Sequence, residues 1–246
     1  MSDPSRGESQ ASFPTTHWSL VARAGGISSP EAREALELLC RAYWFPIYAF
    51  IRRHGADPEA ARDLTQSYFT RLLEKDLLGA ADPQKGRLRS FLKTDCTYFL
   101  ADQRDRDRAQ KRGGVRALIR FEALDAEDRY RREMADELTP ERQFDRTWAL
   151  TLLDRVLDQL ATEYADSGRG ALFERLQVAL TPGSLLSSYA ALAAQLGMTE
   201  GAVQVAVHRL RRRYRAILRE QIAATLDDPT DADVEDEIRA LFAALG

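Results

Sequence analysis

The stretch from residue 187 to 220 constrains the fold more than any other, because it predicts two helices joined by a tight turn. Apolar residues share one face of the first segment, and Gly197 supplies the left-handed backbone that ends a helix sharply. Thr199 is placed to cap the second segment, in which Val203 and Val207 begin an apolar stripe of helical spacing. The pattern predicts a helix-turn-helix with a strongly cationic second helix.

The face opposite that apolar stripe suits DNA recognition. Arginine side chains position a protein on phosphates, and Gln204 with its neighbours can read base edges. An arginine-rich face is also common on ordinary solvated helices. DNA is favoured because Ala193 is small where the helices cross and because the positive charge falls on the second helix only. The predicted DNA-binding residues of this motif are Thr199, Gly201, Gln204, Val205, His208, Arg209, Arg211, Arg212 and Arg215.

Composition places the rest of the chain in the all-α class. Alternation typical of strands is scarce, and a length of 246 residues allows one or two domains. The net charge of −3 averages opposed segments, since the second helix of the motif is basic and residues 227–237 are almost purely acidic.

No pattern in the sequence predicts catalysis or metal binding. Cys40 and Cys96 stand among apolar residues and are expected to be small buried side chains. Two cysteines and three scattered histidines give no zinc spacing, and no nucleophile or phosphate-binding glycine loop is visible. We therefore expect no cofactor, no metal and no enzyme activity. A polar N-terminus without a long apolar run predicts no membrane segment and a cytoplasmic location.

Glycine and proline residues divide the chain into segments. Gly113 and Gly114 end a charged helix, and Thr139 with Pro140 begins the next ordered one. The predicted organisation is a disordered N-terminus (1–12), a first helical domain (13–114), a charged linker (115–138), a helix-turn-helix domain (139–223) and an acidic tail with a short helix (224–246).

The first domain is expected to hold three long helices, near residues 30–54, 57–75 and 88–108. Pro46 should kink the first, because it lacks a backbone N–H, and Asp57 should cap the second.

A cationic run ends the third helix and follows two aromatic residues, Tyr98 and Phe99. Aromatic rings beside arginines can stack extruded bases while phosphates are held. A salt-bridged, exposed helix end would have the same sequence, so this segment alone leaves both interpretations open.

The acidic tail also has two interpretations. It could shield the arginine-rich helix in cis and lower non-specific DNA affinity, or its helix could simply pack on a domain.

Taken together, these segments resemble an extracytoplasmic-function (ECF) sigma factor of bacterial RNA polymerase along nearly the whole chain. The resemblance is carried by YWFPIYAFIRRH (43–54), DPEAARDLTQSYFTRLLEK (57–75), GRLRSFLKTDCTYFLADQRDRDRAQKRGG (86–114) and the helix-turn-helix. The opening PTTHWSLV and the run RDRAQKRGG are similar to a subgroup abundant in planctomycetes.

The resemblance implies three sets of contacts. One is with promoter DNA in the minus-thirty-five element, through the helix-turn-helix. A second is with core RNA polymerase, through Asp63, Leu64, Gln66 and Phe69. The third is with the minus-ten element during melting, through Arg87, Arg89, Tyr98, Arg104, Arg106, Arg108, Lys111 and Arg112.

This sequence departs from the family pattern at two places. Gln204 and Ala206 stand where many relatives carry Lys and Arg, so the promoter contacts are expected to differ. The segment EYADSGRGALFERL (163–176) replaces a short proline-containing turn. Further expected partners are an anti-sigma factor or a regulatory kinase.

Two other functions fit parts of the sequence. A free-standing helix-turn-helix regulator would use its N-terminal helices to bind a ligand or to dimerise. An anti-sigma or adaptor protein would keep the helical interfaces without needing both basic regions. The presence of two separate basic elements favours the sigma factor.

Overall fold

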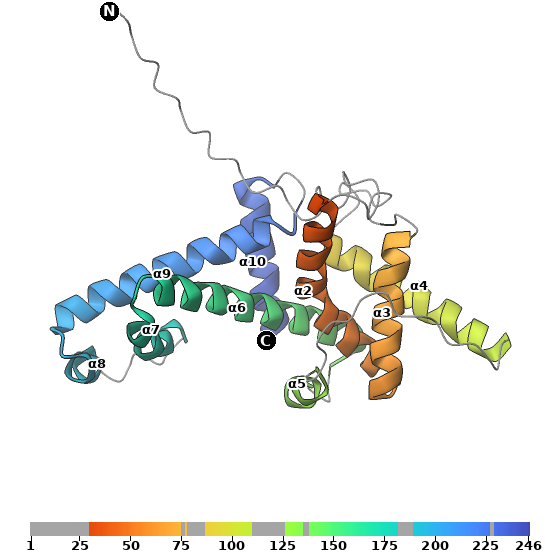
Figure 1. Cartoon of the computed structure of the whole chain (residues 1–246), viewed down its shortest axis with the longest axis horizontal. Coiled ribbons are helices and arrows are strands. Elements are labelled where there is room, and N and C mark those ends of the chain that lie inside the picture. Colours follow the sequence, from red (N-terminus) through yellow and green to blue (C-terminus); the bar gives the residue numbers. More distant parts are fainter. Residues whose placement is uncertain are drawn as a thin grey trace, which may run out of the picture.

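The computed structural model describes residues 30–74, 77, 87–109, 126–134, 138–181, 189–226 and 229–246. Every regular element in these ranges is helical, which confirms the predicted all-α fold. The expectations for residues 1–29 and for the break at residues 113–114 lie outside the described residues. The elements are α2 (Pro30–Arg53), α3 (Pro58–Glu74), α4 (Leu88–Ala109), α5 (Ala126–Glu133), α6 (Pro140–Asp166), α7 (Gly170–Leu176), the 3-10 helix η2 (Gln177–Leu180), α8 (Tyr189–Leu196), α9 (Glu200–Ala223) and α10 (Asp231–Leu245) (Figure 1).

Helices α2, α3 and α4 form the N-terminal part of the core. α2 runs through Pro46 as one helix, and the kink expected there stays a prediction. Asp57 caps α3 as predicted, by accepting the backbone N–H of Ala60 at 2.8 Å. α3 and α4 are joined in the interior, where the Tyr68 hydroxyl donates to the carbonyl of Leu92 at 2.9 Å. The buried apolar face of α2 includes Leu39, Cys40, Tyr43, Ile47, Phe50 and Ile51.

Helix α6 is the central element of the structure. Thr139 caps it as predicted, by accepting the N–H of Arg142 at 3.3 Å. It packs against α2 from the predicted first domain, and also against α9 and α10 (Figure 1). Its buried residues follow more than one face: Gln143, Phe144, Thr147, Trp148, Ala149, Thr151, Leu152, Val156 and Leu160. The division into two domains stays a prediction, but α6 contacts helices of both.

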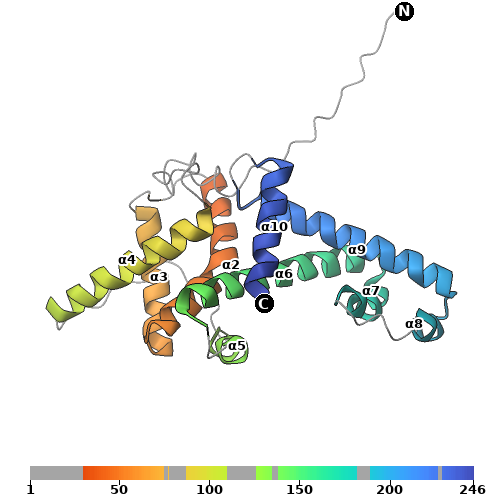
Figure 2. The same ribbon diagram turned by 180° about the vertical axis from the view of Figure 1, so that it is seen from behind.

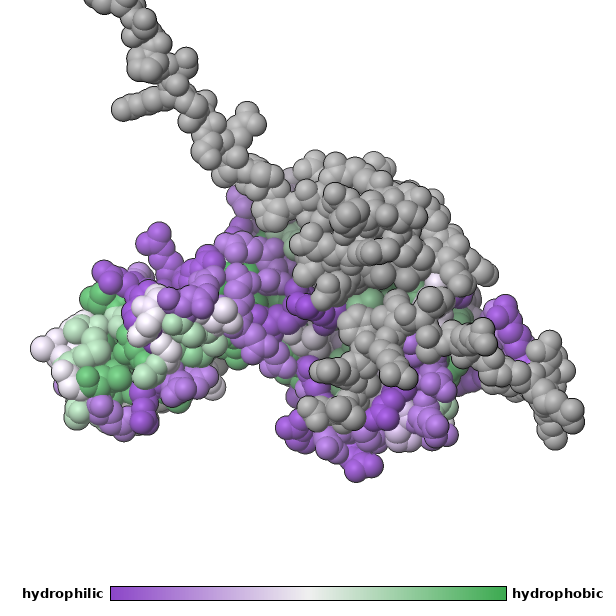
Figure 3. All heavy atoms as spheres, in the orientation of Figure 1, coloured by the Kyte–Doolittle hydropathy of each residue, from purple (hydrophilic) through white to green (hydrophobic). Residues whose placement is uncertain are grey.

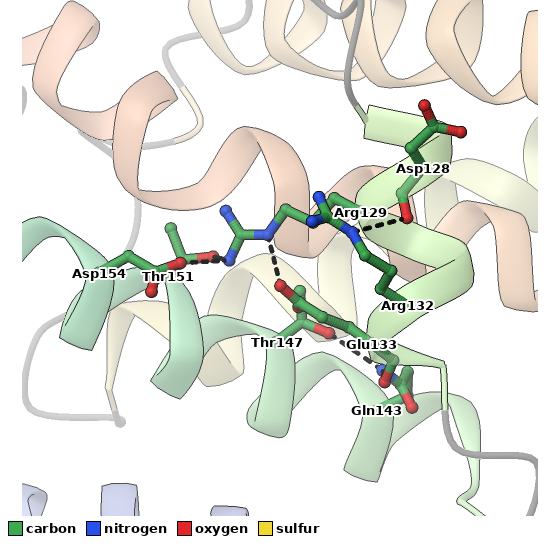
Figure 4. A network of polar contacts seen from close by, with 8 residues as sticks. All are labelled: Asp128, Arg129, Arg132, Glu133, Gln143, Thr147, Thr151 and Asp154. Atoms are coloured by element: carbon green, nitrogen blue, oxygen red, sulfur yellow. Dashed lines mark hydrogen bonds and ion pairs between the residues drawn. The ribbon is translucent and has the colours of Figure 1, made fainter. Parts of the chain in front are cut away.

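Helix α5 lies within the segment expected to be a linker, and it is fastened to α6. Arg129 donates to the Thr151 hydroxyl and the Asp154 carboxylate, each at 3.1 Å (Figure 4). Its guanidinium also lies 4.2 Å from the Phe45 ring centre. The buried Gln143 amide donates to the Glu133 carbonyl at 3.4 Å. These contacts fix the middle and the C-terminal end of α5 against α6.

A second set of contacts ties α5 to α2. The Glu127 carboxylate accepts from Arg52 at 2.9 and 3.0 Å, and from the Tyr48 hydroxyl at 2.8 Å. The paired arrangement is a bidentate Arg–carboxylate contact, and both partners are mostly buried, with 17% and 13% of their side chains exposed. The Arg52 hydrogen bonds hold the pKa of Glu127 below its ordinary value of 4.5, although burial opposes this shift.

Helix α10 closes the fold at the C-terminal end. A capping box begins it, since Thr230 and Asp233 each bond the backbone N–H of the other. Figure 2 shows α10 lying across α6 and beside α9, and both contacts belong to the packing of the core. The acidic tail therefore contains a docked helix, with Val234 and Leu241 buried.

We predict that Glu127→Gln lowers the free energy of unfolding by about 1.5–3 kcal/mol at pH 7, because hydrogen bonds to a charged group are lost. The folded-state pKa is depressed, so this stability is present above pH 4.5 and is lost as the pH falls below it. The difference in free energy of unfolding between the unmodified chain and Glu127→Gln should therefore shrink at low pH. Urea unfolding at pH 7 and pH 4 measures this difference. Asp102→Asn is the control. Its ion pair with Arg106 is exposed, so this substitution should change the free energy of unfolding by less than about 1 kcal/mol.

Candidate nucleic-acid interface

The helix-turn-helix forms as predicted from α8 and α9. Gly197 has φ +62°, the left-handed conformation that a side chain would strain. The turn closes when the N–H of Met198 bonds the carbonyl of Ala193, which is buried where the helices meet. Thr199 then starts α9 by accepting the N–H of Ala202 at 3.2 Å.

The outer face of α9 is open to solvent. Gln204, Val205 and His208 are exposed, and Val205 has 49% of its surface exposed. Arg209, Arg212 and Arg215 are also exposed and make no hydrogen bond or ion pair among the residues that the structure describes. A row of unpaired guanidinium groups along a helix is what phosphate contacts require. Thr199 and Gly201 lie at the start of this face and are exposed as well.

One predicted DNA-binding arginine has an internal role. Arg211 donates through Nε and Nη2 to the carbonyl of Ala179, at 3.1 and 2.9 Å. This carbonyl lies in η2, so the contact anchors α9 to the segment that follows α7. Two of the guanidinium nitrogens of Arg211 are therefore engaged in the fold, while the residue itself stays exposed.

The C-terminal half of α9 is held on α6 by charge. Arg213 donates to both oxygens of Glu163 at 2.6 and 2.8 Å, and to Glu220 at 3.2 Å. The hydrogen bond from Arg213 lowers the pKa of Glu163, and the pKa of Arg213 is raised in turn. Gln221 adds a bond to Gln159 at 2.9 Å. The direction of α9 is thus set by α6.

A shallow groove lies beside the start of α9, with a volume of about 470 Å³. Leu172, Met198 and Val205 give it an apolar lining, and Arg169 and Arg209 line it with charge. Figure 3 shows apolar residues gathered at this end of the molecule, over α7, α8 and the start of α9, among hydrophilic ones. The recognition end therefore presents both charge and apolar surface.

Helix α4 carries the second predicted set of contacts. Tyr98 is 69% exposed, which leaves its ring free to stack on a planar partner. Arg104 donates to the carbonyl of His54 at 2.9 Å, and Arg106 pairs with Asp102 one turn away. Both arginines remain exposed, so these contacts can be exchanged. The side chain of Arg108 and residues Lys111 and Arg112 lie outside the described part of the chain.

Arg87 and Arg89, at the start of α4, differ from the rest of this set. Both form ion pairs with Glu237 of α10, at 2.5 and 2.7 Å, although Arg89 Nε and Glu237 Oε2 make no hydrogen bond among the residues described. Arg89 also lies over the Trp148 ring, 4.9 Å from its centre, and its side chain is only 11% exposed. Glu237 was not singled out from the sequence. Its position could have marked it, because it is an acidic residue on the apolar face of the amphipathic tail helix.

The four residues predicted to bind core polymerase lie on α3 and differ in exposure. Asp63 is exposed, while Leu64 and Gln66 are partly buried. Phe69 is only 2% exposed and lies against Tyr68, with ring centres 5.9 Å apart. Phe69 therefore supports α3 from within, and Asp63 is the member of this set that a partner can reach most easily.

Comparisons of the chain with family models, with curated proteins and with solved structures found no match. Among the described helices, none is both long and apolar enough to cross a membrane. Within the described ranges, no group of three or more histidine, cysteine, aspartate or glutamate side chains is placed to hold a metal ion. Cys40 and Cys96 are both buried, as expected.

We predict that Thr199→Ala lowers the free energy of unfolding by about 1 kcal/mol, because the cap of α9 is lost. Thermal or urea unfolding measures the change. Thr162→Ala is a matched control on α6, where an exposed threonine bonds only the carbonyl one turn earlier and alanine is the better helix former. Equal losses in the two variants would contradict the capping role of Thr199.

Proposed function

We propose that this protein is a sigma factor of the ECF type, which binds core RNA polymerase and directs transcription from specific promoters. The observation that carries the proposal is the capped helix-turn-helix with its row of unpaired arginines on α9. In this role α9 enters the major groove of the minus-thirty-five element, where its arginines contact phosphates. Gln204 is placed among them to read a base edge.

The second basic element supports the same proposal. A sigma factor needs a separate surface for the minus-ten element, and α4 offers an exposed Tyr98 and, two turns further along the same helix, the exposed Arg104 and Arg106. Two modest DNA contacts reinforce each other when a large partner holds them at a fixed separation. Core polymerase would provide that frame and would carry out the chemistry. The proposed location is therefore the cytoplasm, where the polymerase acts.

The alternative is a free-standing regulator that uses the helix-turn-helix alone. Such proteins usually bind as dimers at two half-sites. The exposed aromatic residue on α4 has no role in that mechanism, so it favours the sigma factor. Binding to core polymerase separates the two functions directly.

For the recognition helix, Arg212→Ala should weaken binding to a mixed-sequence DNA duplex. Loss of one phosphate contact lowers the slope of log affinity against log salt by about 0.9. Fluorescence anisotropy at several salt concentrations measures the slope. Arg175→Ala is the matched control, because Arg175 is an exposed arginine on α7 and lies off the recognition helix. If both variants changed the slope equally, the effect would be one of net charge alone.

For the polymerase contact, Asp63→Lys should weaken binding to bacterial core RNA polymerase at least tenfold, or ~1.4 kcal/mol. The reason is that a reversed charge meets the partner surface that Asp63 is proposed to face. Binding is measured with the full chain, and initiation is scored from a library of genomic fragments. Glu174→Lys on α7 makes the same charge change on another exposed site. Sequence-specific DNA binding without any affinity for core polymerase would assign the protein to the free-standing regulators.

A further inference from the structure

The contact between α10 and α4 joins the tail of the chain to one of its proposed DNA-binding surfaces. Glu237 lies on α10 with a side chain only 1% exposed, and it binds Arg87 and Arg89. Those arginines belong to the set expected to hold the minus-ten element. A buried carboxylate is costly unless charged partners compensate it, so the two arginines are required for α10 to dock in this position.

The environment of the pair shows that Glu237 is built into the interior. Arg89 is shared between Glu237, the Asp145 carboxylate at 3.4 Å and the face of the Trp148 ring. Side chains from α4, α6 and α10 thus meet at one guanidinium group. Removing α10 would leave Arg87 and the outer part of Arg89 without their carboxylate partner.

The rest of the α10 interface is small. Its fully buried apolar side chains are Val234 and Leu241, with the partly buried Ile238 and Leu245 beside them. Arg146 of α6 donates to the carbonyl of Leu245 at 2.8 Å, and a groove of about 540 Å³ remains between α6 and the last turns of α10. Alanine residues line the α10 side of this groove, at Ala240, Ala243 and Ala244. At the other end of the helix, Arg219 of α9 pairs with Asp231 at 2.8 Å and with Glu235, and these pairs are largely exposed. Exposed pairs contribute little to stability, so α10 can be released without unfolding the core.

The geometry points to α10 as an internal latch that competes with nucleic acid for Arg87 and Arg89. Carboxylates and phosphates bind guanidinium groups in the same way, so the Glu237 carboxylate occupies the place of a backbone phosphate. A short connection tethers α10 to α9, so the Glu237 carboxylate has a high effective concentration near Arg87 and Arg89. Phosphates that bind weakly from solution therefore do not displace it. This inference rests on the proposed function, and it names how the α4 surface is kept closed in the free chain.

The latch differs from simple shielding of the recognition helix. The acidic residues of the tail reach Arg219 near the end of α9 but no other arginine of that helix among the residues described. Arg209, Arg212 and Arg215 remain open. The contact therefore controls α4 and leaves the helix-turn-helix available, which allows the two DNA contacts to form in sequence.

The test uses the full chain and a single-stranded DNA oligonucleotide, since α4 is the proposed single-strand surface. Glu237→Gln should raise the affinity roughly 5-fold to 25-fold at 0.1 M salt, because one or two arginines become available to phosphates. The slope of log affinity against log salt should steepen by about 0.7 for each arginine that becomes available. Asp236→Asn is the matched control, because it removes the same charge one position away, where Asp236 pairs only with Arg239 on the same helix.

A second pair of variants leaves the net charge unchanged. Leu241→Ala removes a fully buried contact of α10, whereas Phe242→Ala changes its neighbour, which is 54% exposed. Only Leu241→Ala should raise the affinity for the oligonucleotide. Circular dichroism and thermal unfolding check that every variant is folded at the assay temperature.

The two proposals fail in different ways. If folded Glu237→Gln and Leu241→Ala bind DNA no better than their controls, the latch is overturned, and core polymerase binding by the unmodified chain still supports the sigma factor. If the affinities rise as expected but the chain has no affinity for core polymerase, the latch is supported and the sigma factor is overturned.

Discussion

The fold depends on the burial of α6 on several of its faces. A helix whose buried residues extend around its circumference cannot lie at a surface, so neighbours must pack on it from different directions. α2, α9 and α10 meet this need, and α5 adds a polar clamp. The consequence is that helices from distant parts of the chain share one core. The placement of α9 relative to α4 is therefore decided by how α6 is covered.

Arginine–carboxylate pairs set the direction of the helices that cover α6. Arg52 with Glu127 holds α5 on α2, Arg213 with Glu163 holds α9 on α6, and Arg89 with Glu237 holds α10 against α4. Apolar burial drives association but is non-directional, whereas the bidentate contacts of Arg52 and Arg213 favour one geometry. The chain uses arginine for two purposes, since those that face another helix are paired and those on the outer face of α9 are not.

Local patterns in the sequence were sufficient for the helices and for the helix-turn-helix. Asp57, Thr139 and Thr199 cap the helices that they were expected to cap, and Gly197 adopts a positive φ. These features depend on residues a few positions apart. The engagement of Arg89, Arg211 and Glu237 was not predictable in this way, because each contact joins residues at least 32 positions apart, and periodicity does not encode which distant helix lies opposite. Phe69 belongs to the set that the resemblance assigns to polymerase binding and is buried, because a family motif marks a helix and not which of its side chains face outward.

The length of α9 has a mechanical consequence. Its 24 residues form an uninterrupted rod of about 36 Å, with the open arginines Arg209, Arg212 and Arg215 around its middle. Arg213 fastens this rod to α6 between the open arginines, and Arg219 pairs with α10 further along. A rigid rod that is held at two points keeps a fixed direction. The open arginines therefore share one alignment, which the core sets in advance of any contact with a partner.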